Sequence, residues 1–374
     1  MLALAATCLL AAPPEIDAGR YRSHVEHLAS DDLRGRGGAD SRIAAEYVAA
    51  RFAEIGLEPL YGEDLIKPIL DPDGPEIGEN VGGLLPGTGD AAGEYVLVTA
   101  HHDHLGTRGD RIYNGANDNA TGAAMVIEVA RALKDAGCGR TLVFISFGLE
   151  ERMLWGSRTF VSDPPIDLSK IRLFITADML GRPLGGLPMS DVFVIGAESV
   201  AIDGESPTAF ADRIDAFAAE IDRPTLRIGA DIVGTRSDYG PFRDKDAPFV
   251  FFSTGENPDY HRPSDVAETI DYDMAVGNAR LIAAVARDAA STDESFAWST
   301  DRPADIAEAK TLRRVTDLLL AEAEAGRREL PVVERVLVQQ VNDRAKAVVN
   351  SGEFSAADRA LFKRAAQALL LSVF

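Results

Sequence analysis

The residues best suited to chemistry fall first in one short loop. The stretch AHHDHLG, residues 100–106, places three of the chain's six histidines around one aspartate, directly after an apolar run. An imidazole beside a carboxylate is typical of metal ligation and of proton transfer, because the carboxylate fixes the tautomer of the ring. A single H-x-D pair is also common in solvated loops, so this loop needs partners elsewhere in the chain.

The other candidate residues each follow an apolar run or open a helix. They are Asp118 in GANDNATG, the pair Glu150 and Glu151 after FISFG, Asp178 in ITADMLG, and His261 in YHRPSD. Taken singly, each has an ordinary explanation, such as a helix cap or a solvated loop. Two adjacent carboxylates at the mouth of a buried strand, however, are costly unless they share a cation or a proton. Imidazole and carboxylate groups in this number suit a pair of zinc ions with one bridging carboxylate.

The elements that must position these residues alternate between strand and helix. Strands are predicted at 95–99, 141–146, 173–176, 192–195 and 249–253, and helices at 41–55, 123–134, 154–161, 209–221 and 274–290. This alternation predicts an α/β fold with a mixed, mostly parallel sheet and helices on both faces. Ligands of such sheets bind at the carboxyl ends of the strands, which is where the candidate residues fall.

Two further regions flank this pattern. Residues 56–79 are rich in proline and glycine and are predicted to form a loop. Beyond residue 293 the composition shifts to Ala, Leu, Val, Glu and Arg, which predicts helices at 306–325, 332–349 and 355–374, the last with Ser355 and Asp358 as a capping box. We therefore expect a main domain at 15–292 and a helical extension at 293–374. The extension either stabilises the main domain, forms a dimer surface or caps the site.

The first residues, MLALAATCLLAAPPE, contain a short apolar run followed by two prolines. Residues 1–14 are typical of a signal peptide without its positive start, so we expect an exported protein. Lipid attachment at Cys8 and an N-terminus with no targeting role are the alternatives. No later apolar stretch reaches the ~18 to 20 residues that a membrane span requires.

Composition limits the partners. The formal net charge of -21 argues against nucleic acid or an anionic membrane as a partner, because both would repel this protein. Two cysteines exclude a disulfide framework and a thiolate metal cluster. The chain also lacks the H-E-x-x-H and G-x-S-x-G patterns of other hydrolases. An acidic protein suits a substrate with a cationic end.

In order and spacing, six segments resemble the co-catalytic zinc aminopeptidases of metallopeptidase family twenty-eight. They are AHHDHLG, NGANDNATG, FGLEERMLWGS, ADMLG, SDYGPF and DYHRPSD. The resemblance covers about residues 24–292, including GRGGADSR before the first long helix. It implies the phosphorylase/hydrolase-like fold of zinc-dependent exopeptidases and two zinc ions per chain. It also implies an activity, the removal of N-terminal residues from peptides by a metal-activated water.

The resemblance further implies a role for each matching residue. The metal ligands are His101, Asp118, Glu151, Asp178 and His261. Asp118 bridges the two metals, and His101 and Glu151 serve different ones. Glu150 is the general base, Asp103 holds the imidazole of His101, and Tyr260 polarises the substrate carbonyl.

The remaining histidines of the loop are given other roles. We expect His102 to pack or line the site and His104 to shape the loop. Two departures from the family put substrate preference in doubt more than chemistry. Met153 replaces a glycine that commonly follows the glutamate pair, and SDY at 237–239 replaces a Ser-Asp-His triplet. We expect Asp238 to line the pocket nonetheless.

Two alternative functions remain open. One is a glutaminyl cyclase-type transferase on the same fold, which uses one zinc ion and lacks so complete a second ligand set. The other is a non-catalytic peptide-binding ectodomain that has lost its ligands. Metal content and an assay on a peptide with N-terminal glutamine separate the first alternative from an aminopeptidase.

Overall fold

The computed structural model describes residues 13–71, 73–300 and 305–372, and a mixed nine-stranded sheet forms its centre. Its strands run in the order β1 (Glu58–Pro59), β3 (Glu76–Leu85), β7 (Thr141–Phe147), β4 (Tyr95–His101), β8 (Ile171–Ala177), β12 (Phe249–Ser253), β9 (Val192–Ile195) and β11 (Thr225–Ile228), with β2 (Ile66–Leu70) paired to β3. The four central strands β7, β4, β8 and β12 are parallel, whereas β3 and β9 run antiparallel to their inner neighbours. The predicted mixed sheet is confirmed.

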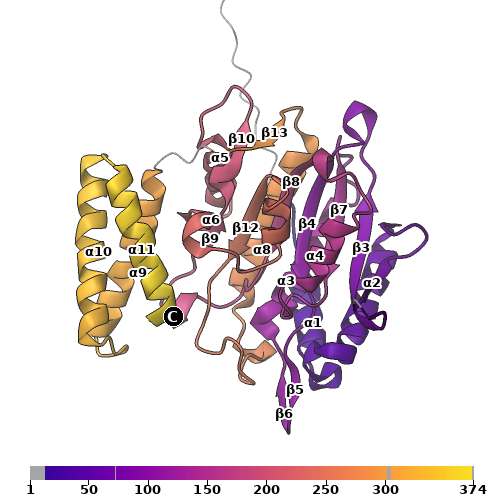
Figure 1. Ribbon diagram of the computed structural model, residues 1–374, viewed down its shortest axis with the longest axis horizontal. Helices are drawn as coiled ribbons and strands as arrows, with labels where there is room; N and C mark the ends of the chain where they lie inside the picture. The colour runs from indigo at the N-terminus through magenta and orange to yellow at the C-terminus, as the bar shows by residue number, and fades with distance from the viewer. Residues whose placement is uncertain (1–12, 72, 301–304, 373–374) are drawn as a thin grey trace, which may run out of the picture.

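Helices cover both faces of the sheet (Figure 1). One core packs against α1 (Ala18–Leu28), α2 (Ser41–Ile55), α3 (Thr121–Leu133), α5 (Ala209–Glu220) and α8 (Tyr272–Ser291). The other packs against α4 (Trp155–Ser162), α6 (Ala230–Val233) and α7 (Tyr239–Arg243). Successive side chains of a strand point to opposite faces, so Val96 and Val98 of β4 enter the first core and Leu97 enters the second. Both faces are buried, which explains the continuous apolar runs of the central strands.

The prediction of a loop at residues 56–79 is wrong, because this stretch contains β1, β2 and the start of β3. Its proline and glycine content reflects a sheet edge. Pro68 is tolerated in β2 because that strand pairs only with β3, so one side of it needs no hydrogen-bond donor. Gly82 of β3 is required by close packing, since a Cβ there would lie 2.5 Å from the side chain of Leu60.

Two small pairs of strands complete the main domain. The strands β5 (Gly106–Arg108) and β6 (Arg111–Tyr113) form a hairpin, and β10 (Val200–Ile202) pairs with β13 (Phe296–Trp298). The β5–β6 hairpin directly follows the histidine loop at the end of β4. It projects from the lower edge of the sheet in Figure 1.

The C-terminal region consists of α9 (Ile306–Glu324), α10 (Val332–Ser351) and α11 (Ala356–Ser372), at the β11 side of the sheet (Figure 1). The predicted capping box is present at the start of α11, where the main-chain N–H of Asp358 donates to Ser355 Oγ at 3.2 Å and that of Ser355 to Asp358 Oδ2 at 3.2 Å. These helices contact the main domain directly. Thr311 of α9 donates to the carbonyl of Arg227 in β11 at 2.7 Å.

Some sequence-based expectations fall outside what the structure describes. The signal-peptide-like segment 1–14 lies almost wholly beyond the described residues, as do the last two residues of the predicted C-terminal helix. The domain boundary at residue 293 stays a prediction. Within the described ranges, none of the helices combines the length and apolar character needed to cross a membrane.

Candidate metal centre

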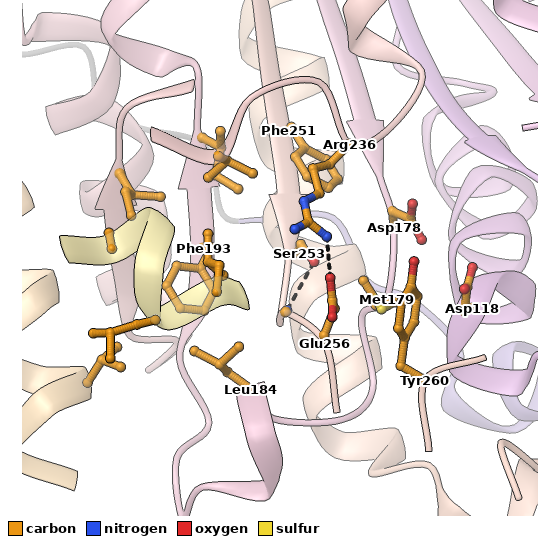
Figure 2. Close-up of a pocket in the computed structure, with 18 of the residues that line it drawn as sticks. Asp118, Asp178, Met179, Leu184, Phe193, Arg236, Phe251, Ser253, Glu256 and Tyr260 are labelled. Atoms are coloured by element: carbon orange, nitrogen blue, oxygen red, sulfur yellow. Dashed lines mark hydrogen bonds and ion pairs between the residues drawn. The ribbon is translucent and has the colours of Figure 1, made fainter. Parts of the chain in front are cut away.

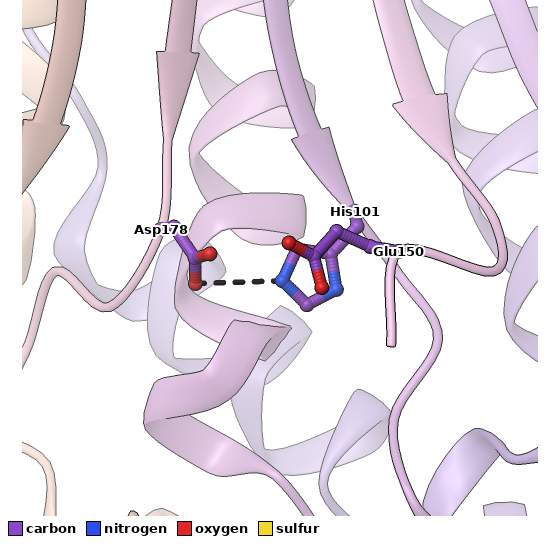
Figure 3. Close-up of side chains that lie close together, drawn as sticks. All are labelled: His101, Glu150 and Asp178. Atoms are coloured by element: carbon purple, nitrogen blue, oxygen red, sulfur yellow. Dashed lines mark ion pairs between the residues drawn. The ribbon is translucent and has the colours of Figure 1, made fainter. Parts of the chain in front are cut away.

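The predicted site residues meet beyond the carboxyl ends of the central strands, in two neighbouring clusters. The first contains His101, which ends β4, Glu150, which follows β7, and Asp178, which follows β8; their ligand atoms lie within 4.8 Å of one another (Figure 3). His101 Nε2 is 3.4 Å from Asp178 Oδ1. The second cluster contains Glu151, which follows Glu150, and His261, which lies in the loop after β12. His261 Nε2 is 3.1 Å from Glu151 Oε2. Residues from four separate strand ends are thus brought together.

Asp118 lies between the two clusters. Its Oδ1 is 3.4 Å from His101 Nε2 in the first cluster, and its Oδ2 is 3.3 Å from His261 Nε2 in the second. The two oxygens of one carboxylate therefore face different histidines. This is the arrangement that a carboxylate bridging two cations requires.

The spacing of these atoms fits divalent cations better than a network of hydrogen bonds. His101 Nε2 and Asp178 Oδ1 are buried and have no hydrogen-bond partner within the described part of the chain. Buried polar atoms are normally satisfied, so such atoms require an explanation. In a tetrahedral zinc site with bonds of ~2.0–2.1 Å, neighbouring ligand atoms lie about 3.3 Å apart. The contacts of 3.1–3.4 Å around Asp118, His101 and His261 match this distance.

The charges of the site also favour a cation. Burial raises the pKa of Glu150 well above its usual range and raises the pKa of Asp118 to about 6, with Glu151 adding to the second shift. Burial lowers the pKa of His261, but hydrogen bonds to Asp118 and Glu151 outweigh it and bring the value to about 10. The clustered carboxylates therefore favour a positive charge beside them, as the raised pKa of His261 shows. Divalent cations would supply the same positive charge.

The loop that carries Asp118 is fixed by its neighbours through the main chain. The carboxylate of Asp265 accepts the N–H groups of Asn117 and Asp118 at 2.9 and 3.1 Å. The side-chain amide of Asn119 donates to the carbonyl of Ala177, the last residue of β8, at 2.9 Å. The peptide bond between Asp118 and Asn119 is cis. The bridging position is thus tied to the end of β8 and to the loop that carries His261.

Asp103 supports both the histidine and the glutamate pair. Its carboxylate accepts the main-chain N–H groups of Glu150 and Glu151 at 3.0 and 3.3 Å. His101 Nδ1 lies 3.2 Å from the main-chain oxygen of Asp103 and 3.6 Å from its carboxylate. A proton on Nδ1 directed at either oxygen leaves Nε2 unprotonated and able to bind a metal.

The turn that follows the glutamate pair contains Met153, which stands where the resemblance gives a glycine. Met153 has a φ of 63°, which lies in the left-handed region where glycine is favoured. Its side chain is 78% exposed, so the substitution places no methionine in the site.

His104 was assigned only a loop-shaping role from sequence, but the structure places it beside the second cluster. Its ring is buried, and Nδ1 lies 2.7 Å from Glu151 Oε1 and 3.8 Å from Asp118 Oδ2. It forms a candidate metal-binding group with those two carboxylates. Its position in the same loop as His101 is the signal that the sequence offers. His102, in contrast, is buried with Nδ1 3.0 Å from Ser146 Oγ, in keeping with the packing role expected for it.

Arg36 is a supporting residue that sequence reasoning missed. It is fully buried and donates to the carbonyls of His102 at 2.7 Å and Gly115 at 2.8 Å, so it joins the two loops that carry His101 and Asp118. Burial lowers its pKa to about 10, while nearby carboxylates, Asp118 first among them, act in the opposite direction. Its place in the GRGGADSR segment was the available signal, but contacts with main-chain oxygens leave no residue pattern.

A cavity of about 140 Å³ opens beside the clusters, and Tyr260 lines it (Figure 2). The ring of Tyr260 stacks on that of His261 with centroids 3.9 Å apart, and its hydroxyl end points toward the side where Asp118 and Asp178 lie. The expectation that Asp238 lines this pocket is wrong. Its side chain is fully buried outside the cavity lining, at the start of α7, and the preceding Ser237 instead donates to Asp178 Oδ2 at 3.1 Å.

Comparison with known proteins agrees with this geometry. Residues 80–286 match the sequence model of Peptidase family M28. Aminopeptidase YwaD from Bacillus subtilis (strain 168) is 28% identical over 212 residues, which cover 54% of this chain and 42% of that protein. The match therefore spans less than half the length of this curated relative.

Solved structures share the fold. The LapA aminopeptidase of Legionella pneumophila superposes with a TM-score of 0.58 at 19% identity, covering 74% of this chain and 73% of that chain. Glutaminyl cyclase from Porphyromonas gingivalis superposes with a TM-score of 0.56 at 16% identity, covering 73% of this chain and 98% of that chain. The fold is common to both activities, so only the residues of the site can separate them.

Proposed function

This chain belongs to peptidase family M28, and from that premise we propose that it is a zinc-dependent aminopeptidase that removes N-terminal residues from peptides. The observation that carries the proposal is the position of Asp118, whose two carboxylate oxygens face two different histidines. A one-metal transferase has no need of a carboxylate shared in this way. A binding domain has no need of the orphaned, buried ligand atoms around it.

The ligands divide into two sets with one shared member. His101 and Asp178 would hold one zinc ion, Glu151 and His261 the other, and Asp118 would contact both. When bound, the ions supply Lewis acidity to the attacking water and to the scissile carbonyl. Asp103 keeps His101 in the tautomer that leaves Nε2 free. His104 lies against the Glu151 oxygen that does not face His261, and so restrains that carboxylate.

Glu150 is the general base that takes up the proton of the attacking water. Its carboxylate lines the cavity beside His101 and Asp178, and burial raises its pKa, which makes the carboxylate a stronger proton acceptor. Glu150 accepts the proton of the attacking water on a carboxylate oxygen and delivers it to the departing amine. Tyr260, whose hydroxyl end points toward the side where Asp118 and Asp178 lie, donates a hydrogen bond to the substrate carbonyl. The acidic side chains of the site attract the α-ammonium group of the substrate.

The proposal is tested with aminoacyl p-nitroanilides and with the same compounds after N-acetylation. The purified protein, supplied with zinc, should release p-nitroaniline from the free amines, lose this activity in a chelator and regain it with added zinc. Acetylated substrates should stay intact. Cleavage of acetylated substrates would contradict an exopeptidase. Cyclisation of an N-terminal glutamine peptide without hydrolysis would instead favour the transferase.

The role of Glu150 is tested by Glu150→Gln. The amide keeps the size of the side chain but cannot take up a proton, so turnover should fall by about 10² to 10⁴, the range of general acid–base contributions. Zinc content by atomic absorption should stay the same as in the wild type. Near-normal turnover with full zinc content would remove Glu150 from the role of base, and loss of zinc would make it a ligand.

A further inference from the structure

The cavity beside the metal centre is two-sided. Its near side carries the acidic residues of the site, and its far side is apolar (Figure 2). Between the two lies an ion pair of Arg236 and Glu256, whose opposite charges offset each other. The volume of about 140 Å³ is close to the ~150 Å³ of an engineered cavity that accommodates benzene. The lining of the far side therefore suits an apolar side chain, whereas a charged one finds no net opposite charge there.

The wall at the far end of the cavity comes from the C-terminal helices. Leu312 and Val315 of α9 and Ala366 and Leu369 of α11 line it, facing Phe193 of the sheet. Figure 2 shows α11, in yellow, closing the cavity on the side of Phe193. The stretch that matches Peptidase family M28 ends at residue 286, so this wall lies outside the region that defines the family.

The wall is held in place by specific contacts. Arg359 of α11 binds both Asp231 of α6 and Glu308 of α9 at 2.8 Å, and Lys363 binds Asp231 at 3.0 Å. On α9, Thr311, next to Leu312, bonds to the main chain of β11 at 2.7 Å. Helix α9 is thus anchored to the main sheet and α11 to α6 and α9, so the size of the cavity is fixed by their packing.

We propose that α9 and α11 form the end of the pocket for the N-terminal side chain of the substrate, and that Ala366 and Leu369 set the largest apolar side chain that the enzyme accepts. This inference rests on the proposed aminopeptidase function. It assigns to the helical extension a direct part in specificity, in addition to any stabilising role. The substrates it selects carry a large apolar first residue, such as leucine or phenylalanine.

The test changes the depth of the pocket in opposite directions. Ala366→Phe fills the far end and should lower the ratio of kcat/KM for leucyl over alanyl p-nitroanilide by about 10-fold or more, since one methylene group in a pocket changes rates by about 10- to 200-fold. Leu369→Ala deepens the pocket and should raise the ratio for tryptophanyl over leucyl substrate. Ala360→Phe and Leu361→Ala make the same changes at exposed positions of α11 and should leave both ratios unchanged.

Binding measurements separate this inference from the proposed function. Phenylalaninol and alaninol carry a free amine but no scissile bond. Calorimetry of the zinc-loaded protein should show tighter binding of phenylalaninol than of alaninol in the wild type and in Leu369→Ala, but not in Ala366→Phe. The wild type could fail to hydrolyse any substrate while Ala366→Phe still abolishes the preference for phenylalaninol over alaninol. In that case the pocket assignment holds and the aminopeptidase proposal fails. If both pocket variants keep the wild-type ratios and preference, the inference is overturned. Should Ala366→Phe fail to fold, Leu369→Ala decides alone, because it only removes atoms.

Discussion

At the scale of single residues, Asp118 determines whether the two clusters act together. Asp118→Ala removes a carboxylate that faces both His101 and His261, so we expect zinc content to fall from two ions per chain to one or fewer. Atomic absorption after dialysis measures this directly. Asp110→Ala, at an exposed position of the β5–β6 turn, is the matched control and should keep both ions. Two ions bound to the Asp118→Ala protein would contradict the bridging role.

Asp265 acts on the site through the main chain. Asp265→Ala leaves two buried N–H groups, those of Asn117 and Asp118, without acceptors, and each orphaned group costs about 1–3 kcal/mol. We expect a lower melting temperature and weaker zinc binding. Asp265→Asn retains one acceptor oxygen and should fall between alanine and the wild type. Equal melting temperatures and zinc affinities for all three proteins would show that Asp265 does not hold the Asp118 loop.

Sequence predicted the residues that the structure brings together at the candidate site, but not all of those that support them. His101, Glu150 and Asp178 could be found because each directly follows a predicted strand, and parallel strands end at one edge. Arg36 could not be found in this way, since its partners are carbonyl oxygens that any residue supplies. For His104 the sequence predicts only a loop-shaping role, because spacing alone does not tell which histidine of a loop turns inward.

At the scale of elements, the central strands were predictable and the edge strands were not. Strands such as β4 and β8 are buried on both faces, so they carry continuous apolar runs. The edge strand β2 has partly exposed residues and contains Pro68, and the composition of a loop is similar. Only pairing with β3 distinguishes it from a loop, and pairing is a property of the fold.

The anchor of α11 gives a prediction for acid stability. Burial acts to raise the pKa of Asp231, but Arg359 and Lys363 outweigh it and lower the value to about 2, below the ~3.8 of an unfolded aspartate. A depressed pKa stabilises the fold above pH ~3.8, and that stabilisation is lost as the pH falls through about 2. Asp231→Asn should therefore melt at a lower temperature than the wild type at pH 7, by a margin that shrinks between pH 4 and pH 2.

The control for this prediction is Asp343→Asn, on the exposed side of α10. Thermal unfolding monitored by circular dichroism at each pH supplies the comparison. A difference between Asp231→Asn and the wild type that stays constant down to pH 2 would show that the charge of Asp231 does not stabilise the α11 anchor.

At the scale of the whole molecule, the helices of the C-terminal extension could be predicted from the sequence, but their place beside the cavity could not. Helical spacing placed the three C-terminal helices closely, and the capping box at Ser355 and Asp358 marked the start of α11. Their relation to the cavity could not be read from the sequence, because it depends on contacts such as that of Arg359 with Asp231, which are 128 residues apart. Long-range ion pairs of this kind carry no local pattern.

The net charge of -21 acts on the whole molecule and gives the last prediction. An acidic protein attracts cationic substrates over a range set by salt, about 10 Å at 0.1 M and about 3 Å at 1 M. The value of kcat/KM for a leucyl peptide with two following lysines should therefore fall several-fold between 0.05 and 0.5 M NaCl, mainly through KM. The same peptide with two following glutamates should improve, because screening weakens its repulsion. Zinc content measured at each salt concentration is the control for metal loss, and equal salt dependence of the two peptides would show that the net charge does not steer substrates to the site.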